Sequence, residues 1–367
     1  MSTAPLAARI DRHVRHDVQG MHAYAIQPSA GLIKLDAMEN PFRLPEALQL
    51  ELGERLARVA INRYPTTCVA DVVAALSKHV ELPVGCALML GNGSDEIISL
   101  LAMAFDVPGA AILAPVPGFV MYETSAKLQG LGFVGVPLTA DFELDLPAML
   151  VAIERHRPAL TYVAYPNNPT ANLWDEASVE AVVQAVAAQD GFVVFDEAYQ
   201  PFSSRTWLPR VAEHEHVVVV RTLSKFGLAG VRLGYLAGRS AFVAEIDKVR
   251  PPYNIGALNA EATLFALAHA DVFAEQAHVL RAERARLLVA LAALPGVRPY
   301  PSEANMILVR VPRAQCVFEG LKARGVLVKN VSAMHPLLAD CLRLTVGTPE
   351  ENARLLEALA ASLPDAR

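Results

Sequence analysis

The chain of 367 residues has few cysteines, and its four, Cys68, Cys86, Cys316 and Cys341, are scattered without C-x-x-C spacing. This scarcity excludes a disulfide framework and a cysteine zinc site, and it favours free thiols in a reducing compartment. Basic residues are not in excess either, because 32 Lys and Arg face 38 Asp and Glu, for a formal charge of -6. The composition excludes the basic surface of a nucleic-acid-binding protein and a polybasic membrane patch. We expect no nucleic-acid partner and no metal site.

Long apolar runs are also missing. The longest charge-free stretch, residues 107–122, is interrupted by three prolines and two glycines, which a membrane helix would not tolerate at this density. The first fifteen residues alternate charged with small side chains and lack the apolar core of a signal peptide. We therefore expect a cytoplasmic protein without a membrane segment.

The apolar content is nevertheless high, at 53% of the residues, which is enough for one large core or two. Short β-rich runs at 111–114, 160–164, 191–195 and 217–220 have the uninterrupted apolar character of strands buried on both faces. Residues 176–189 between them have helical spacing. This alternation predicts an α/β fold, with a mostly parallel central sheet flanked by helices.

The pattern changes after Pro251-Pro252. Residues 258–294 form an almost continuous helical pattern, followed by a strand-like run at 306–311 and a last helix after Thr348. We expect three parts: an arm over residues 1–40 that also contributes to the small domain, a large domain over 41–250, and a smaller C-terminal α/β domain over 251–367.

Polar side chains follow three of the predicted strands. Asn168 follows the run at 160–164, Asp196 follows the run at 191–195, and Lys225 follows the run at 217–220. In open α/β sheets ligands bind beyond the carboxyl ends of the strands, so these three groups should meet at one crevice. Their convergence carries more weight than any one of them alone.

The chemistry of these groups suits pyridoxal phosphate. A buried lysine such as Lys225 has a lowered pKa and is suited to Schiff-base formation. A buried carboxylate such as Asp196 needs a cationic partner, which a protonated pyridine nitrogen supplies. Tyr199 and Asn168 are positioned to donate to the phenolate oxygen of the same ring. Taken alone, Lys225 is better explained as the partner of a strand-end carboxylate, and Asn168 can serve simply as a turn residue.

Two further segments are candidates for binding a phosphate group. Gly93, Ser94 and Asp95 precede an apolar helical run, where free backbone N–H groups and the helix dipole attract anions, although ordinary helix capping explains them as well. Thr222, Ser224 and Arg232 offer hydroxyls and a bidentate cation. Taken alone, Arg232 is equally explained by a surface ion pair. Phe119 is a candidate to stack on an aromatic ring, and an isolated Phe is more often a core residue.

Together these motifs resemble one family. Tyr165-Pro-Asn-Asn-Pro-Thr170, Asp196-Glu-Ala-Tyr199 and Thr222-Leu-Ser-Lys225 with Arg232 are similar in order and spacing to the fold-type I pyridoxal-phosphate aminotransferases. Three more stretches resemble the histidinol-phosphate aminotransferases within that family: Leu35-Asp-Ala-Met-Glu-Asn-Pro41, Asn62-Arg-Tyr-Pro65 and the segment 341–352. The resemblance extends from about residue 20 to residue 360.

The resemblance implies a role for each matching residue. Lys225 would form the Schiff base and move the proton, Asp196 would hold the pyridine nitrogen, and Tyr199 would contact the ring oxygen. The other implied cofactor residues are Gly93, Ser94, Asp95, Phe119, Asn168, Thr222, Ser224, Arg232 and, from the neighbouring subunit of a homodimer, Tyr64. The implied substrate residues are Arg343, Lys329, Tyr24 and Asn40.

Two departures from the family pattern concern the anion sites. The loop from Lys225 to Arg232 is one residue shorter than the commoner spacing, so the reach of Arg232 must be recovered by the backbone. Lys329 stands where many members have a second arginine, and a lysine lacks the forked geometry of a guanidinium group.

The resemblance implies a ping-pong transamination between L-histidinol phosphate and 2-oxoglutarate, giving imidazole-acetol phosphate and L-glutamate, a reaction of histidine biosynthesis. Two related activities use the same cofactor residues: a threonine-phosphate decarboxylase and a broad aromatic amino-acid aminotransferase. A binding protein that retains the fold without activity is the alternative from another class.

Overall fold

The computed structural model describes residues 5–21 and 27–364, which fall into two compact units, 1–31 and 32–367. The described part of the first unit holds two short helices, α1 (Leu6–His13) and α2 (His16–Gln19), neither of which has a buried residue. The second unit holds every strand of the described chain. Among the described helices, none combines the length and the apolar character needed to cross a membrane.

A seven-stranded sheet forms the centre of the larger half of the second unit. Its strand order is β2-β8-β7-β6-β5-β3-β4. The strands are β2 (Cys86–Gly91), β3 (Ala111–Val116), β4 (Gly132–Pro137), β5 (Leu160–Ala164), β6 (Phe192–Asp196), β7 (Val217–Thr222) and β8 (Gly234–Arg239). Strand β8 runs antiparallel to both of its neighbours, and the other pairs are parallel. The predicted mostly parallel sheet is confirmed. Both ends of each strand predicted for this sheet lie within two residues of the ends of an observed strand.

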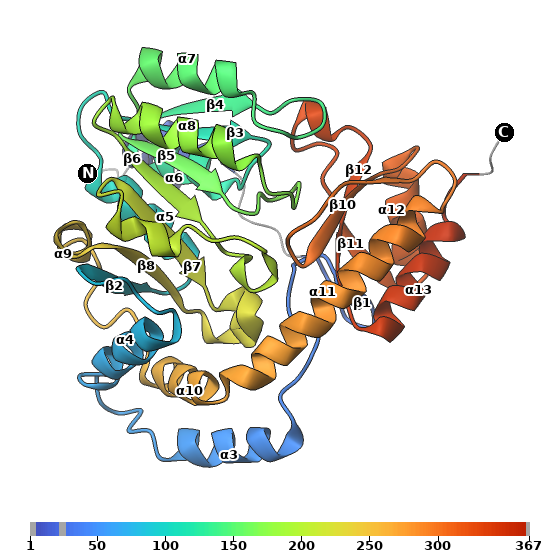
Figure 1. Ribbon diagram of the computed structural model, residues 1–367, viewed down its shortest axis with the longest axis horizontal. Coiled ribbons are helices and arrows are strands. Elements are labelled where there is room, and N and C mark those ends of the chain that lie inside the picture. The colour runs from blue at the N-terminus through green and yellow to red at the C-terminus, as the bar shows by residue number, and fades with distance from the viewer. Residues whose placement is uncertain (1–4, 22–26, 365–367) are drawn as a thin grey trace. The chain divides into compact units, whose positions relative to one another are not determined.

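Helices cover both faces of this sheet (Figure 1). Helices α4 (Cys68–His79), α7 (Leu146–His156) and α8 (Glu176–Ala187) pack on one face, and α5 (Ser94–Ala104), α6 (Met121–Gln129) and α9 (Ser240–Asp247) pack on the other. Alternate side chains of β7 supply the two cores, since Val217 and Val219 point to the first and Val218 and Val220 to the second. The all-apolar strands of the sequence are thus explained by burial on two faces.

A five-stranded sheet forms the centre of the smaller half, with the order β1-β11-β12-β10-β9. Its strands are β1 (Ile33–Leu35), β9 (Arg298–Pro299), β10 (Met306–Arg310), β11 (Val326–Asn330) and β12 (Cys341–Thr345). Helices α11 (Ala270–Ala292), α12 (Ala314–Ala323) and α13 (Pro349–Ala360) bury their apolar faces against it. Strand β1 pairs in parallel with β11, so the chain near residue 35 belongs to this sheet.

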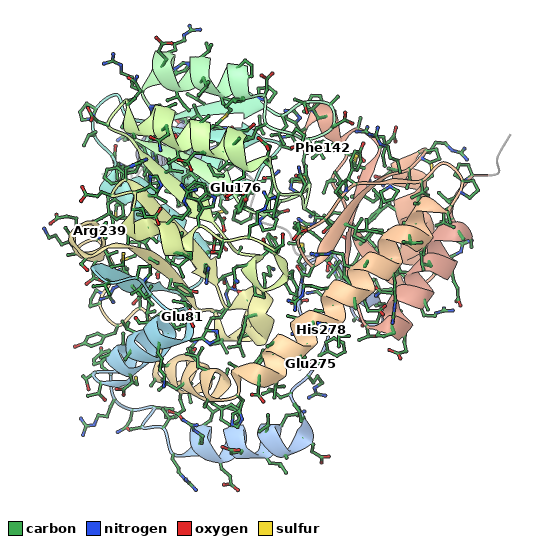
Figure 2. The ribbon with its side chains drawn as sticks, in the orientation of Figure 1. Glu81, Phe142, Glu176, Arg239, Glu275 and His278 are labelled. Atoms are coloured by element: carbon green, nitrogen blue, oxygen red, sulfur yellow. The ribbon has the colours of Figure 1, made fainter. Side chains whose placement is uncertain are left out.

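The long helical pattern after Pro251 is two helices. Helix α10 (Ala257–Ala268) packs against α3 (Glu46–Ala57) and α4, and α11 begins after His269 and runs to the smaller sheet (Figure 1). Figure 2 labels Glu275 and His278 on the first half of α11. Residues 32–367 form one compact unit, so the boundary placed near Pro251 stays a prediction.

Short helical turns complete the described fold. They are 3-10 turns at Gln200–Phe202, Leu208–Ala212, Ala229–Val231 and Pro336–Leu338, and a π-helical turn at Ser224–Leu228. The π-helical turn follows β7 directly and carries Lys225.

Candidate active site

The ends of β5, β6 and β7 lie side by side in the larger sheet. Ala164 is paired with Asp196, and Asp196 with Val220, so the segments that follow these strands leave the sheet at one edge. The sequence-based expectation that Asn168, Asp196 and Lys225 approach one crevice follows from this register.

Lys225 lies in the π-helical turn, and its Nζ donates a hydrogen bond of 2.9 Å to the carbonyl oxygen of Ala37. Loss of hydration, with the positive charge of Arg343 as a second cause, lowers the pKa of Lys225 to about 8. An ammonium group with that pKa releases its proton near neutrality, which a lysine nucleophile requires.

Asp196 is the last residue of β6, and only 5% of it is exposed. Its Oδ2 accepts a hydrogen bond of 2.7 Å from the hydroxyl of Tyr122, and its Oδ1 accepts one of 3.1 Å from the backbone N–H of Ala198. Burial raises the pKa of Asp196 to about 6, although both hydrogen bonds act in the opposite direction. Among the described residues it has no ion-pair partner, so a cationic ligand group would complete this site.

A second cluster gathers donors at the start of α5. Arg232 places Nη1 3.2 Å from the hydroxyl of Ser224 and Nη2 3.9 Å from a carboxylate oxygen of Asp95. Thr222 donates a hydrogen bond of 3.0 Å to the same Ser224 hydroxyl. A Cβ atom at Gly93 would come within 2.8 Å of Arg232 Nη2, so the close approach of the guanidinium group depends on glycine there. Hydroxyls, a guanidinium group and a helix N-terminus together fit a phosphate.

The short loop between Lys225 and Arg232 is accommodated by its backbone. Gly227 has φ of 134° and Arg232 has φ of 54°, both outside the ordinary helical region. This tight path brings the guanidinium group back to Ser224 and Gly93.

Arg343 connects the smaller sheet to the loop after β5. It lies on β12 and donates from Nη1 to Asn168 Oδ1 at 2.7 Å and from Nη2 to the carbonyl oxygen of Asp36 at 2.8 Å. Lys329 is directly opposite Arg343 in the antiparallel pairing of β11 with β12. The two basic residues are thus cross-strand neighbours on this sheet, an arrangement that suits an anionic substrate group.

Tyr199 and Phe119 lie beside these groups. Tyr199 is buried, and burial raises its pKa above the usual range, so its hydroxyl stays protonated and can donate. Phe119 is half-buried and meets Tyr122 edge to face, with the ring centroids 5.7 Å apart.

Two of the predicted site residues, Tyr64 and Asn40, pair with other side chains within the described chain. Tyr64 is 71% exposed and stacks on Tyr253 with the ring centroids 4.4 Å apart. Asn40 donates from Nδ2 to Gln276 Oε1 at 2.8 Å and accepts from the backbone N–H of Phe42, so its amide is already engaged. Tyr24 lies outside the described residues.

Sequence reasoning missed two kinds of partner. The carbonyl oxygens of Asp36 and Ala37 receive Arg343 and Lys225, and a backbone oxygen leaves no mark in the choice of residue. Tyr122 was missed as the partner of Asp196. Its closeness in sequence to Phe119 was the available signal, and the two rings meet edge to face.

Comparison with known proteins places this arrangement in a family. The model of the family described as aminotransferase class I and II matches residues 30–359. The chain belongs to the class I and II aminotransferases. Pyridoxal 5′-phosphate is the cofactor of these enzymes. The Asp196 carboxylate, which has no ion-pair partner among the described residues, the low-pKa Lys225 and the hydroxyls and guanidinium group at Arg232 fit its three polar groups.

Relatives of this aminotransferase carry a more specific name. The histidinol-phosphate aminotransferase of Methylibium petroleiphilum is 71% identical over 98% of this chain and 97% of its own. That of Polaromonas naphthalenivorans is 62% identical over 98% of this chain and all of its own. The crystal structure of histidinol-phosphate aminotransferase from Sinorhizobium meliloti in complex with pyridoxal-5′-phosphate superimposes with a TM-score of 0.82, covering 94% of this chain and 96% of that one. At 24% identity this last match supports the fold alone.

Proposed function

We propose that this aminotransferase transfers an amino group between L-histidinol phosphate and 2-oxoglutarate, giving imidazole-acetol phosphate and L-glutamate. Two substrates use one site in turn, so the reaction is of the ping-pong type. The observation that carries the proposal is the pairing of Arg343 with Lys329 across β11 and β12 beside the Lys225 turn, in a chain 71% identical to a histidinol-phosphate aminotransferase.

The cofactor residues have separate tasks in this proposal. Bound pyridoxal phosphate supplies the electron sink for the bond that breaks at the substrate Cα. Lys225 would hold the cofactor covalently through Nζ, and an amine whose pKa burial lowers to about 8 is suited to moving the proton as well. Asp196 keeps the ring nitrogen protonated, and Tyr199 and Asn168 contact the ring oxygen.

The phosphate end of the cofactor binds at the first turn of α5. Gly93, Ser94 and Asp95 offer the helix N-terminus, and Ser224 and Arg232 offer a hydroxyl and a guanidinium group. Thr222 orients the Ser224 hydroxyl through their hydrogen bond of 3.0 Å. Phe119 stacks on one face of the ring.

The anionic end of each substrate binds at Arg343. Its guanidinium group is held by Asn168 and by the Asp36 carbonyl oxygen, so it is oriented before a substrate arrives. Lys329 adds a second positive charge at the neighbouring position of β11. One site can thus take the carboxylate of glutamate or the phosphate of histidinol phosphate. Tyr24 and Asn40 are weaker candidates for contact with the substrate.

Absorbance spectroscopy of the purified holoenzyme tests the proposal. Addition of L-histidinol phosphate should convert the yellow cofactor to its amine form, and 2-oxoglutarate should restore the yellow colour. A cofactor that histidinol phosphate leaves unchanged would contradict the substrate assignment. Carbon dioxide release from threonine phosphate would then point to the decarboxylase, and faster turnover of phenylalanine to the aromatic aminotransferase.

Lys225→Ala tests the role of the lysine. The variant should lose turnover and keep part of its affinity for pyridoxal phosphate, because the phosphate cluster and Asp196 are unchanged. Wild-type turnover in this variant would contradict the assignment of the Schiff-base lysine. Loss of turnover also argues against a binding protein without activity.

The proposal includes a homodimer and a cytoplasmic location. Tyr64 would reach the cofactor phosphate of the neighbouring subunit, which accounts for a large aromatic residue that is 71% exposed in the single chain. All four cysteines are free thiols, which supports a reducing compartment. Sedimentation velocity of the holoenzyme would measure the oligomeric state directly.

A further inference from the structure

The hydroxyl of Tyr122 makes the only side-chain hydrogen bond to Asp196 among the described residues. The bond is 2.7 Å long and reaches Oδ2 from α6, on the face of the sheet that α5 and α6 cover. Tyr122 is 2% exposed and stacks on Tyr162 of β5, with the ring centroids 4.2 Å apart and the planes 11° from parallel. The ring is therefore held on one side by β5, and its hydroxyl has little freedom to leave the carboxylate.

The surroundings of Asp196 otherwise oppose its negative charge. Burial and the carboxylates of Asp95 and Glu197 all favour the protonated acid. Glu197 is partly neutralised by Arg221, whose Nη2 lies 2.8 Å from Oε2. The two groups that favour the ionised form are the Tyr122 hydroxyl and the backbone N–H of Ala198. A carboxylate has about four acceptor positions, so two remain for a ligand.

We propose that Tyr122 is a positioning residue for catalysis: its hydrogen bond keeps Asp196 ionised and oriented, so that the proton shared by Asp196 and the cofactor ring nitrogen stays on the nitrogen. The electron sink depends on that proton, since a neutral pyridine withdraws electrons less strongly. Tyr122 itself gives up no proton.

The electrostatics of Tyr122 support the role of a permanent donor. Burial, followed by the nearby charge of Asp196, raises the pKa of Tyr122 well above its usual range, so the hydroxyl stays protonated whenever Asp196 is ionised. A hydrogen bond to a charged group corresponds to about a 10- to 100-fold change in an equilibrium constant. Removing the hydroxyl should change the equilibrium between the nitrogen-bound and the Asp196-bound proton by a factor of that order, in favour of Asp196.

The experiment uses the holoenzyme loaded with pyridoxal phosphate carrying ¹⁵N in its ring. The ¹⁵N chemical shift separates the protonated from the neutral ring nitrogen, with no substrate present. In Tyr122→Phe we expect the signal to move toward neutral pyridine and kcat to fall about 10- to 100-fold, with a smaller change in KM. Tyr162→Phe is the matched control, because Tyr162 is equally buried in the same stack and its hydroxyl has no hydrogen-bond partner in the described structure. This control should keep the wild-type signal and kcat.

The outcomes separate the proposal from the function on which it rests. A neutral ring nitrogen in the wild-type enzyme would overturn the role given to Asp196. A protonated nitrogen in both wild type and Tyr122→Phe would overturn the role of Tyr122 alone. Equal losses in Tyr122→Phe and Tyr162→Phe would show a packing effect and would likewise overturn it.

A second variant covers the case in which Tyr122→Phe fails to fold. Site-specific 3-fluorotyrosine at position 122 keeps the hydroxyl and nearly the same volume and makes the donor more acidic. We expect this substitution to move the ¹⁵N signal further toward the protonated form, because a stronger donor stabilises the Asp196 carboxylate. A shift in the opposite direction, or none, would overturn the proposal.

Discussion

Lys225 and Asp196 are each held in surroundings that disfavour their charged form. Burial lowers the pKa of the lysine to about 8 and raises that of the aspartate to about 6. The two shifts have opposite signs and one cause, the loss of water around a charge. In a folded protein such shifts cost stability, and they persist here because a cofactor with an aldehyde and a basic ring nitrogen uses both groups.

The lowered pKa of Lys225 predicts the pH dependence of cofactor uptake. Only the neutral amine attacks an aldehyde, and at pH 7 a pKa of about 8 leaves about one amine in ten neutral, against about one in 3,000 for an ordinary lysine. The rate at which the apo-protein binds pyridoxal phosphate covalently should rise about tenfold per pH unit and level off near pH 8. Stopped-flow absorbance measures it.

The control for this rate is a free lysine derivative, whose rate should continue to rise to about pH 10. If the apo-protein rate also continued to rise to that pH, the lowered pKa of Lys225 would be wrong.

The raised pKa of Asp196 predicts that the apo-protein gains stability when this charge is removed. The folded state holds the proton up to about pH 6 and the unfolded chain only up to about pH 4, so ionisation of Asp196 costs stability as pH rises through that window. Above pH 6 the full cost is about 3 kcal/mol at most. Asp196→Asn should raise the free energy of unfolding of the apo-protein by about 1–3 kcal/mol at pH 8 while abolishing efficient turnover.

Urea unfolding of both apo-proteins at pH 4, 6 and 8 measures this difference, at one protein concentration. The gain should shrink toward pH 4, where the wild-type carboxyl is protonated in the folded state and about half protonated in the unfolded chain. A variant less stable than wild type at pH 8 would contradict the assigned cost.

At the scale of elements, the turn from Ser224 to Arg232 decides where three site residues lie. It begins in a π-helical turn, continues through a 3-10 turn and ends at Arg232 in the left-handed region. Helices and strands around it are regular, so this short segment absorbs the irregular geometry that brings Lys225, Ser224 and Arg232 together. The tight path from Lys225 to Arg232 is possible because Gly227 takes a conformation that other residues rarely adopt.

Gly227→Ala therefore should damage the site. A Cβ atom there would meet Phe273 Cδ1 at 2.7 Å and Asn40 Nδ2 at 3.0 Å, and the backbone φ of 134° is strained for alanine. We expect a loss of about 1–3 kcal/mol in the free energy of unfolding and at least a tenfold weaker affinity for pyridoxal phosphate.

Gly230→Ala is the matched control in the same turn, because no atom lies within 4 Å of its added Cβ. It should leave both quantities close to wild type. Thermal unfolding and fluorescence titration with pyridoxal phosphate measure them, and equal effects at the two glycines would contradict the steric argument.

At the scale of the whole molecule, the proposed homodimer would complete the site with Tyr64 of a second chain. Tyr64 is exposed and stacks on the exposed ring of Tyr253. A second copy of the chain would bring Tyr64 to a cofactor phosphate and cover this aromatic pair. Activity then depends on assembly as well as on folding.

Mixed subunits test this dependence. Lys225→Ala and Tyr64→Ala homodimers should each be impaired, because every site lacks one group. A mixed dimer would contain one site with both Lys225 and the Tyr64 of its neighbour. Re-assembled mixtures should regain up to about a quarter of the wild-type kcat, since half the dimers are mixed and half their sites are complete. Activity equal to the average of the two homodimers would contradict the shared site.

The sequence by itself determined the sheet and the strand-end chemistry. Strands at 160–164, 191–195 and 217–220 were predictable because short apolar runs rich in β-branched residues are typical of strands buried on both faces. The convergence of the segments that follow β5, β6 and β7 was predictable because parallel strands present their carboxyl ends at one edge. These are local rules, and the sequence is sufficient to apply them.

Only the tertiary structure decided which groups touch. Tyr122 and Asp196 are 74 residues apart, and Lys225 and Ala37 are 188 apart. Their contacts depend on how helices pack on the sheet and how the segment before residue 40 returns to it, which no local pattern encodes. The break of the long helical pattern at His269 was likewise decided by packing, since α10 lies against α3 and α4 while α11 turns toward the smaller sheet.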